Sequence, residues 1–460
     1  MRARGGRARP WVWLVVAALA GGAGVVCSAG VAAGDIIATR WPLLEVIGAW
    51  WVAFAIGVAA LLHAPRRAGL VVVVLVALAL RAAALTGGPA LSDDLYRYAW
   101  DSRVQAAGID PYRHPPLDAQ LTGLRDSWLW PTPAGCAAID RVPGCTRIGR
   151  PAARTIYPPV AELWFLAVHT VAPQAHESAW RAAALAVELA LLAVLLAVLR
   201  GLGRDPRWAA LYAWSPVAVI ETVQNGHVDG LAALLAVIAV WAARRRPARS
   251  AALVAAATLV KLYPAALLPM LLGRGRQAIR PVAILLGLVA VAYLPHVLAV
   301  GVKVLGYLPG YLQEEHYAGG GRFQLLALVG VQGVVAQGVA VVLILAVVVW
   351  VLRTRGLDRI PEVAGRRVLG GLLLIATPVQ PWYALPLLAV AALDGAWWWA
   401  APAAAAYPLY FSEVLNGPSN FAGRLGYAVA ALVVLAGALT ARRRTKDRSG
   451  WLASAPHPAG

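Results

Sequence analysis

The sequence predicts an all-α membrane protein with a bundle of about 11 to 14 transmembrane helices. Of its 460 residues, 60% are hydrophobic and only 14% are charged, and the mean hydropathy is +0.67. Soluble domains carry about 45–50% apolar and about 25% charged residues. Long apolar runs follow one another closely, which indicates one transmembrane domain over residues 1–445. Residues 446–460 form a polar, Pro-containing tail, which we expect to be disordered and cytoplasmic.

The net charge of +19 lies in clusters between the apolar runs. Basic clusters occur at residues 2–9, 66–67, 244–249, 274–280, 366–367 and 442–448. Because cytoplasmic loops of membrane proteins carry an excess of Lys and Arg, we expect these clusters and both chain termini in the cytoplasm. The charge then reflects membrane topology, and no nucleic-acid partner is expected.

The expected spans follow the apolar runs in order. The first run is long enough to cross a membrane and has no convincing cleavage site, so we expect a retained helix rather than a signal peptide. With it, the spans lie at about residues 11–33, 43–62, 69–86, 178–200, 207–222, 228–243, 280–300, 323–352, 366–379, 382–398, 399–412 and 425–441.

Two apolar segments do not fit this simple scheme. The run 251–272 is divided at Lys261-Leu-Tyr-Pro264 into pieces too short to cross about 30 Å of hydrocarbon, so we expect a broken or dipping pair of helices. Counting residues 159–171 as a span would place the cluster at 244–249 outside. We therefore prefer a juxtamembrane or partly dipping helix there.

This topology leaves one large extracytoplasmic loop with juxtamembrane helices, residues 87–157. It contains seven of the 22 acidic residues, together with Cys136 and Cys145. The outer face of a membrane is oxidising, so a disulfide between these two cysteines is predicted. Cys27 lies in the first span and is interpreted as a small packing residue.

A pair of carboxylates opens this loop. Asp93 and Asp94 follow Ser92, which can cap a helix, and Arg97 and Asp101 follow at helical spacing. A solvated ion-pair face is the alternative. We favour a site, because carboxylates at a membrane boundary among aromatic residues can acquire the raised pKa of a general base.

Two Pro-rich segments of the loop carry tyrosines. Tyr112 lies in Gly108–Pro116, and Tyr157 lies in Thr155–Val160. Proline fixes φ and biases the preceding residue toward extended geometry, so these segments can hold the tyrosines rigidly over the membrane surface. A rigid loop without a binding role and a substrate contact are both compatible with this pattern.

Ionisable side chains also interrupt the apolar sequence further along. His227 and Asp229 lie in an expected outer turn between two apolar runs, and Lys261 lies in the divided run beside Tyr263. Ionisable residues at membrane depth are costly and commonly functional. We interpret His227 and Asp229 as part of a site wall and Lys261 as a phosphate ligand. A structural histidine and a lysine that snorkels to the interface are the alternatives.

A last set of polar and aromatic residues lies in two further outer segments. Gln380, Trp382 and Tyr383 form one turn, and Arg322 follows a tyrosine-rich segment at residues 306–317. These residues suit an aromatic platform for a substrate. Because Trp and Tyr favour membrane interfaces, anchoring is the alternative.

Taken in order, these stretches resemble the GT-C superfamily of polytopic glycosyltransferases, particularly bacterial members related to family 87 and the actinobacterial polyprenol-phosphate-mannose-dependent mannosyltransferases. Each stretch is short, but together they span most of the chain. The matching stretches are Ser92–Asp101 with Gly108–Tyr112, Thr155–Pro159, Gly226–Asp229, Lys261–Pro264 and Pro381–Tyr383.

The resemblance implies a GT-C-like enzyme of the plasma membrane. It would take a sugar, most often mannose, from a polyprenyl-phosphate donor in the membrane lipid and pass it to an envelope glycan or lipid acceptor on the outer face. In such enzymes an acidic residue of the first large outer loop deprotonates the acceptor hydroxyl, and the anomeric carbon inverts. Carried onto this chain, Asp94 is the first candidate for the base and Asp93 the second.

The other site residues receive binding roles from the same resemblance. Lys261 or Arg322 would offset charge on the departing phosphate, and His227 and Asp229 would bind sugar or acceptor hydroxyls. The full set of expected substrate-binding residues is Arg97, Asp101, Tyr112, Tyr157, His227, Asp229, Lys261, Tyr263, Arg322, Gln380, Trp382 and Tyr383. Two spans precede the span that leads into the catalytic loop, whereas many members of the superfamily place that loop after the first span. Metal use differs across the superfamily, so no cofactor is assigned and a divalent metal stays open.

Two other classes of protein share some of these features. A lipid or sugar transporter or flippase also needs many helices, but it would place its charges near the midplane, commonly within inverted repeats, and none is evident here. An intramembrane prenyltransferase would use paired aspartates to hold Mg²⁺ and diphosphate. Its aspartates are expected to face the cytoplasm, whereas the charge pattern places Asp93 and Asp94 outside.

Overall fold

The computed structural model describes residues 9–36, 38–174, 176–273, 275–358, 360–413 and 421–453, and within these ranges every regular element is a helix. Seven helices are long and apolar enough to cross a membrane, so the chain is a polytopic all-α membrane protein. They are α1 (Pro10–Ala32), α2 (Arg40–His63), α3 (Arg66–Ala84), α7 (Glu177–Gly201), α11 (Ile279–Val300), α14 (Gly333–Asp358) and α18 (Phe421–Ala453).

Shorter helices fill the space between these long ones. Three of them are apolar, namely α6 (Pro159–Val171), α9 (Asp229–Ala242) and the segment Pro381–Ala392, which contains α16 (Leu385–Ala392). The others among the bundle helices are α8 (Ala210–Ala213), α10 (Pro247–Thr258), α13 (Gln324–Leu328), α15 (Pro361–Ala376) and α17 (Ala400–Glu413).

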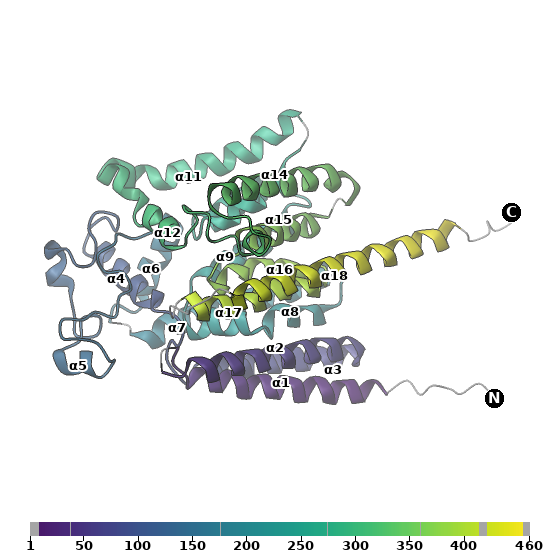
Figure 1. The fold of residues 1–460 in the computed structure, drawn as a ribbon, viewed down its shortest axis with the longest axis horizontal. Helices are drawn as coiled ribbons and strands as arrows, with labels where there is room; N and C mark the ends of the chain where they lie inside the picture. The colour runs from purple at the N-terminus through teal and green to yellow at the C-terminus, as the bar shows by residue number, and fades with distance from the viewer. Residues whose placement is uncertain are drawn as a thin grey trace.

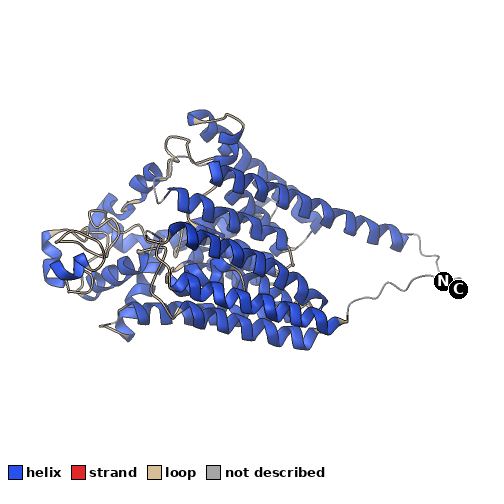
Figure 2. Cartoon of the chain, turned by 60° about the horizontal axis from the view of Figure 1, so that its bottom comes forward, coloured by secondary structure: helices blue, strands red, loops and turns tan. Residues whose placement is uncertain are grey.

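The bundle has two different ends (Figure 1). The Pro10 end of α1 and the Ala453 end of α18 lie at one end. At the opposite end lie α4 (Asp94–Ala106), α5 (Pro133–Ala137) and α12 (Leu308–Glu314), together with most of the loops (Figures 1 and 2). The loop 87–157 therefore lies at the end of the bundle opposite to these two helix ends.

Three expected spans are wrong as single helices. In the segment 382–398, α16 ends at Ala392 and a turn leads to the 3₁₀ helix Trp397–Trp399. The segment 207–222 is divided into α8 and a π-helix, Ala218–Gln224, because Pro216 disfavours helical geometry at the residue before it. The segment 323–352 is divided into α13 and α14, and Gly330 and Gly333 between them have positive φ angles of 80° and 63°. Glycine adopts such angles without steric cost, so the chain turns there.

Other expectations agree with the helix bounds. The run 251–272 is interrupted at 259–262, between α10 and the 3₁₀ helix Tyr263–Leu271. The segment 159–171 forms the 13-residue helix α6, which packs against α4 at the loop-bearing end. By contrast, α18 continues to Ala453, so the expected tail does not begin at residue 446. Residues 454–460 of that tail lie outside the described residues.

A buried ion pair joins α3 and α7 inside the bundle. Arg81 Nη2 lies 2.5 Å from Glu188 Oε2, and both side chains are almost fully buried. Tyr212 also donates a hydrogen bond to Glu188, and Arg81 donates to the carbonyl of Ala213. The pair therefore connects two long helices to the short helix α8.

We predict that Arg81→Met destabilises the protein by about 3–5 kcal/mol, because it leaves the buried Glu188 carboxylate without its counter-charge. The measurement is the melting temperature of the purified protein in detergent. The double variant Arg81→Met/Glu188→Gln removes both charges and should recover part of the loss. Equal melting temperatures for the wild type and Arg81→Met would contradict a stabilising role for this pair.

Candidate active site

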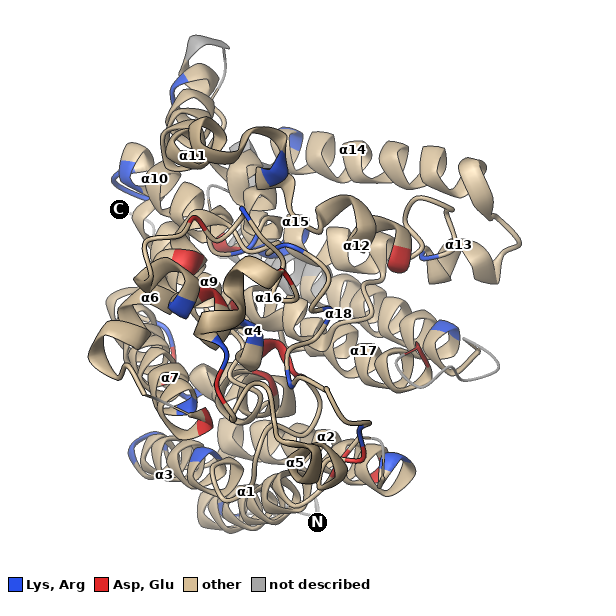
Figure 3. Ribbon diagram, turned by 90° about the vertical axis from the view of Figure 1, so that its left-hand side faces the viewer, with Lys and Arg blue, Asp and Glu red and all other residues tan. Residues whose placement is uncertain are grey.

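A cavity of about 1220 Å³ opens at the loop-bearing end of the bundle. Figure 3 looks onto this end and shows acidic and basic residues around α4, within the surrounding helices. The start of α4, the loop around 139–158, the segment 261–263, α12 and the turn 379–383 all contribute to the cavity wall. The predicted site residues that line it are Asp93, Asp94, Arg97, Tyr157, Lys261, Tyr263, Arg322, Gln380, Trp382 and Tyr383.

The two carboxylates stand at the first turn of α4. Asp93 is the N-cap residue and Asp94 is the first helical residue, whose N–H donates to Ser92 Oγ at 3.2 Å. A Cβ atom on Gly149 would lie 2.6 Å from Asp93 Oδ1, so the loop can pass over this carboxylate only because residue 149 is glycine. Burial raises the pKa of Asp93 to about 6, and the negative charge of Asp94 adds to this effect.

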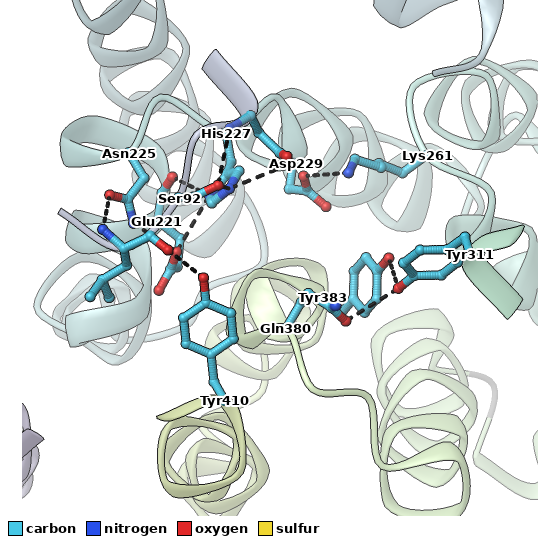
Figure 4. Close-up of polar contacts among 12 residues, drawn as sticks. Ser92, Glu221, Asn225, His227, Asp229, Lys261, Tyr311, Gln380, Tyr383 and Tyr410 are labelled. Carbon is cyan, nitrogen blue, oxygen red and sulfur yellow. Dashed lines mark hydrogen bonds and ion pairs between the residues drawn. The ribbon is translucent and has the colours of Figure 1, made fainter. Parts of the chain in front are cut away.

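The backbone that leads into α4 is held by Asn225. Its Oδ1 atom accepts hydrogen bonds from the N–H groups of Ala90 and Leu91, at 3.1 and 3.2 Å. The Tyr410 hydroxyl donates to the carbonyl of Leu91. The π-helix Ala218–Gln224 and α17 therefore set the position of the two carboxylates from inside the bundle (Figure 4).

His227 lies behind the cavity wall and does not line it. Its side chain is 0% exposed, with Nε2 at 3.0 Å from Ser92 Oγ and 3.7 Å from Asp94 Oδ2. The ring of Trp382 covers it at a centroid distance of 3.9 Å. We expected His227 to contact sugar or acceptor hydroxyls. In the structure its ring instead faces Ser92 and the carboxylate of Asp94 from behind the cavity wall.

Asp229 is also buried behind the wall, where it pairs with Lys261. The distance from Lys261 Nζ to Asp229 Oδ2 is 3.3 Å, and the Tyr263 hydroxyl donates to Asp229 Oδ1 at 3.1 Å. The ammonium group also lies over the rings of Tyr157 and Tyr383, at 5.0 and 5.9 Å. Lys261 thus presents a cation at the cavity surface with its counter-ion beneath it (Figure 4).

The opposite wall contains Arg322 and a group of tyrosines. Arg322 is only 2% exposed and lies between two carboxylates, Glu315 at 3.3 Å and Glu413 at 3.6 Å. The expected phosphate role does not suit a guanidinium that two carboxylates already neutralise. Beside it, Tyr383 shares a 2.8 Å hydrogen bond with Tyr311.

Asp101 and Tyr112 do not line the cavity, contrary to the expected binding roles. Arg97 Nε donates to both carboxylate oxygens of Asp101 at 2.9 Å, so the buried aspartate orients Arg97 rather than a substrate. The Tyr112 hydroxyl donates to the carbonyl of Tyr157 at 2.6 Å and holds that segment in place.

The predicted disulfide is present. It joins Cys136 and Cys145, and the loop that it closes leads directly to Gly149 and Arg150. Arg150 Nε lies 2.8 Å from Glu314 Oε2 on α12. This ion pair connects the outer loop to the far side of the cavity, since both residues line it.

Comparison with known families supports an enzyme at this cavity. Residues 155–378, somewhat under half of the chain, match the model of glycosyltransferase family 87. This match identifies the protein as a glycosyltransferase. Comparisons with curated proteins and with solved structures found no match.

The matched region contributes part of the glycosyltransferase cavity. It contains Tyr157, Lys261 and Tyr263, whereas the two carboxylates precede it and the turn 379–383 follows it. Within the described residues, no group of three or more His, Cys, Asp or Glu side chains could hold a metal ion.

Several cavity residues of this glycosyltransferase had no assigned role in the sequence reasoning. Arg150, Glu314, Tyr311 and Glu413 come from segments far apart in the chain, and each is common in ordinary solvated loops. For Tyr311 and Glu314, the only indication in the sequence of a role in the site was their place in the tyrosine-rich segment 306–317. The sequence shows that Asn225 lies two residues before His227. It does not show that Asn225 binds the backbone at residues 90 and 91.

We predict that Asp93→Asn raises the stability of the glycosyltransferase at pH 7.5. The pKa of Asp93 is about 6 in the folded protein and about 3.9 in an unfolded chain. The folded state therefore keeps a proton that the unfolded chain has lost, and the free energy of unfolding falls as the pH rises from about 4 to about 6. Removing this penalty is worth at most about 3 kcal/mol.

The measurement is the melting temperature of both proteins between pH 4 and pH 8. The two curves should converge toward pH 4. Asp118→Asn is the control, because an N–H group of Gln120 and the side chain of His114 lower the pKa of Asp118, so this variant should gain nothing at pH 7.5. Parallel curves for Asp93→Asn and wild type would contradict the raised pKa.

Proposed function

We propose that this enzyme transfers a sugar, mannose in the first instance, from a polyprenyl-phosphate donor to a hydroxyl group of an envelope glycan or lipid acceptor, with inversion. The observation that carries the proposal is the cavity that brings Asp93 and Asp94 together with Lys261 at one end of a transmembrane bundle. A carboxylate and a cation in one cavity suit a reaction in which a hydroxyl loses a proton while a phosphate departs.

We infer the side of the membrane from the charge distribution. The helix ends at Pro10 and Ala453 lie opposite to the cavity, and basic clusters border both termini. Under the positive-inside rule these ends face the cytoplasm, and the cavity opens on the outer face of the plasma membrane. Sugar nucleotides are absent from that face, so a lipid-borne donor supplies the sugar.

Asp94 is our choice for the general base. Its side chain is 24% exposed and lines the cavity, while Ser92 and His227 stand behind it. Asp94 takes the proton of the acceptor hydroxyl as the hydroxyl oxygen forms a bond to the anomeric carbon. The bond from that carbon to the phosphate oxygen breaks on the opposite face, and its electron pair leaves with the polyprenyl phosphate.

Lys261 is our choice for the phosphate ligand. Its ammonium lies at the cavity surface beside Tyr157 and Tyr383, and a cation there offsets the charge that develops on the leaving phosphate. The membrane-facing surface supports a lipid donor, because α11 at the edge of the bundle exposes Leu286, Val291 and Leu298 among other apolar residues.

We expect Asp94→Asn to lower transfer by about 10²-fold or more, since an amide cannot accept the proton. The measurement is movement of labelled mannose from synthetic polyprenyl-phosphate-mannose to a panel of glycan and lipid acceptors, with purified protein in detergent. Asp118→Asn is the matched control, because this outer-loop carboxylate does not line the cavity.

Wild-type turnover by Asp94→Asn would remove Asp94 as the base and direct attention to Asp93. If wild type transfers no mannose, glucose or arabinose from polyprenyl-phosphate donors to any acceptor, the proposed reaction is wrong. Lipid-flipping assays would then test the transporter alternative.

We expect Lys261→Ala to raise the KM for the donor about tenfold, with a smaller change in the KM for the acceptor. The single variant leaves Asp229 buried without a counter-charge, which is itself destabilising. The double variant Lys261→Ala/Asp229→Asn removes that carboxylate charge and should keep the donor defect while recovering stability. An unchanged donor KM in the double variant would exclude the phosphate role.

A further inference from the structure

Glu221 is a fully buried carboxylate to which the reaction above gives no role. Its side chain is 0% exposed and lies in the π-helix behind the cavity wall. Asn225 Nδ2 donates to Glu221 Oε2 at 3.1 Å, and the Tyr407 hydroxyl donates to Oε1 at 2.8 Å. A carboxylate buried this deeply is costly unless hydrogen bonds or a nearby positive charge offset its burial.

The third neighbour of Glu221 is the imidazole of His227. Nδ1 lies 2.9 Å from the backbone carbonyl of Glu221 and 3.4 Å from its carboxylate Oε2. Both of these oxygens are acceptors only, so Nδ1 carries a proton. The neutral imidazole then has its free lone pair on Nε2. That atom faces Ser92 Oγ and the carboxylate of Asp94.

We propose that His227 and Glu221 form a proton relay that returns Asp94 to its ionised state after each sugar transfer. This inference rests on the proposed function, in which Asp94 is the base. His227 and Glu221 act through Asp94 without touching substrate, and are therefore positioning residues rather than catalytic ones. The three carboxylates around the imidazole are Asp94, Glu221 and Asp229.

The acceptor proton is on Asp94 once the new glycosidic bond has formed and the polyprenyl phosphate has left. It passes from Asp94 Oδ2 to His227 Nε2, which leaves Asp94 as a carboxylate and His227 as an imidazolium. The Glu221 carboxylate offsets that positive charge until the proton leaves to cavity water through the hydroxyl of Ser92, which lies 3.0 Å from Nε2 and lines the cavity. No redox change or additional reactant is involved.

The geometry favours this route. Asp94 Oδ2 and His227 Nε2 are 3.7 Å apart, about 0.5 Å beyond hydrogen-bond reach, and catalytic hydrogen bonds commonly tighten when substrate binds. The backbone fixes the imidazole as well, because the N–H of His227 also donates to the carbonyl of Glu221. This turn requires Gly226, whose φ is 75° and whose Cβ would meet Leu95 at 2.7 Å. Single π-helical turns are frequent at functional sites.

The test compares the pH dependence of kcat in the wild type and in Glu221→Gln, with polyprenyl-phosphate-mannose as donor. Glutamine keeps the size of the side chain but cannot offset the imidazolium. We expect kcat at the optimum to fall at least about tenfold, with donor and acceptor KM within twofold. The acid limb of the kcat profile should move to lower pH by about one unit, because His227 then holds its proton less strongly.

Two control variants distinguish an effect of the Glu221 charge on proton transfer from an effect on side-chain packing. Tyr407→Phe removes one hydrogen-bond donor to Glu221 and leaves the carboxylate charge, so the acid limb should stay at the wild-type pH. Glu221→Asp keeps a carboxylate and should restore the wild-type limb, and it also serves if Glu221→Gln fails to fold.

Three outcomes would overturn the relay. An acid limb that is unchanged in Glu221→Gln, or one that moves equally in Glu221→Gln and Glu221→Asp, assigns Glu221 to structure alone. A wild type that transfers no sugar at any pH overturns the proposed function and the relay with it. An active wild type with an unmoved limb overturns only the relay.

Discussion

A charge inside a membrane protein is tolerated only with a partner, and this requirement organises the whole bundle. Arg81 pairs with Glu188 between α3 and α7, and Lys261 pairs with Asp229 beneath the cavity. Arg322 sits between two carboxylates on the opposite wall. Because the pairs Arg81–Glu188, Lys261–Asp229 and Arg322–Glu413 join segments distant in the chain, these polar contacts also hold different helices together.

The sequence predicted those parts of the fold that depend on local composition. Helices α1, α2, α3 and α7 begin and end within a few residues of the expected spans, since a continuous apolar run has few alternatives in a membrane. The broken segments 207–222 and 323–352 were missed, because an apolar run looks the same whether or not it is interrupted by a turn. Their Pro and Gly residues were the only local signals.

The same distinction applies to the site. Residue type and clustering were enough to predict that Asp93, Asp94, Lys261 and the turn 379–383 belong to one site, and all of them line the cavity. The ion pair of Arg322 with Glu413 could not be foreseen, because Glu413 lies far away in the sequence. Burial likewise decided the position of His227, since a motif does not reveal whether a side chain faces the cavity or stands behind it.

The hydrogen bonds between Asn225 and residues 90 and 91 fix the position of the carboxylates independently of the shape of the cavity rim. The start of α4 is fixed from the interior of the bundle, through an amide side chain and the hydroxyl of Tyr410. Other parts of the cavity rim are joined to one another, as by the ion pair between Arg150 of the outer loop and Glu314 of α12. Substitutions in the rim can therefore change the shape of the cavity while Asp93 and Asp94 keep their place.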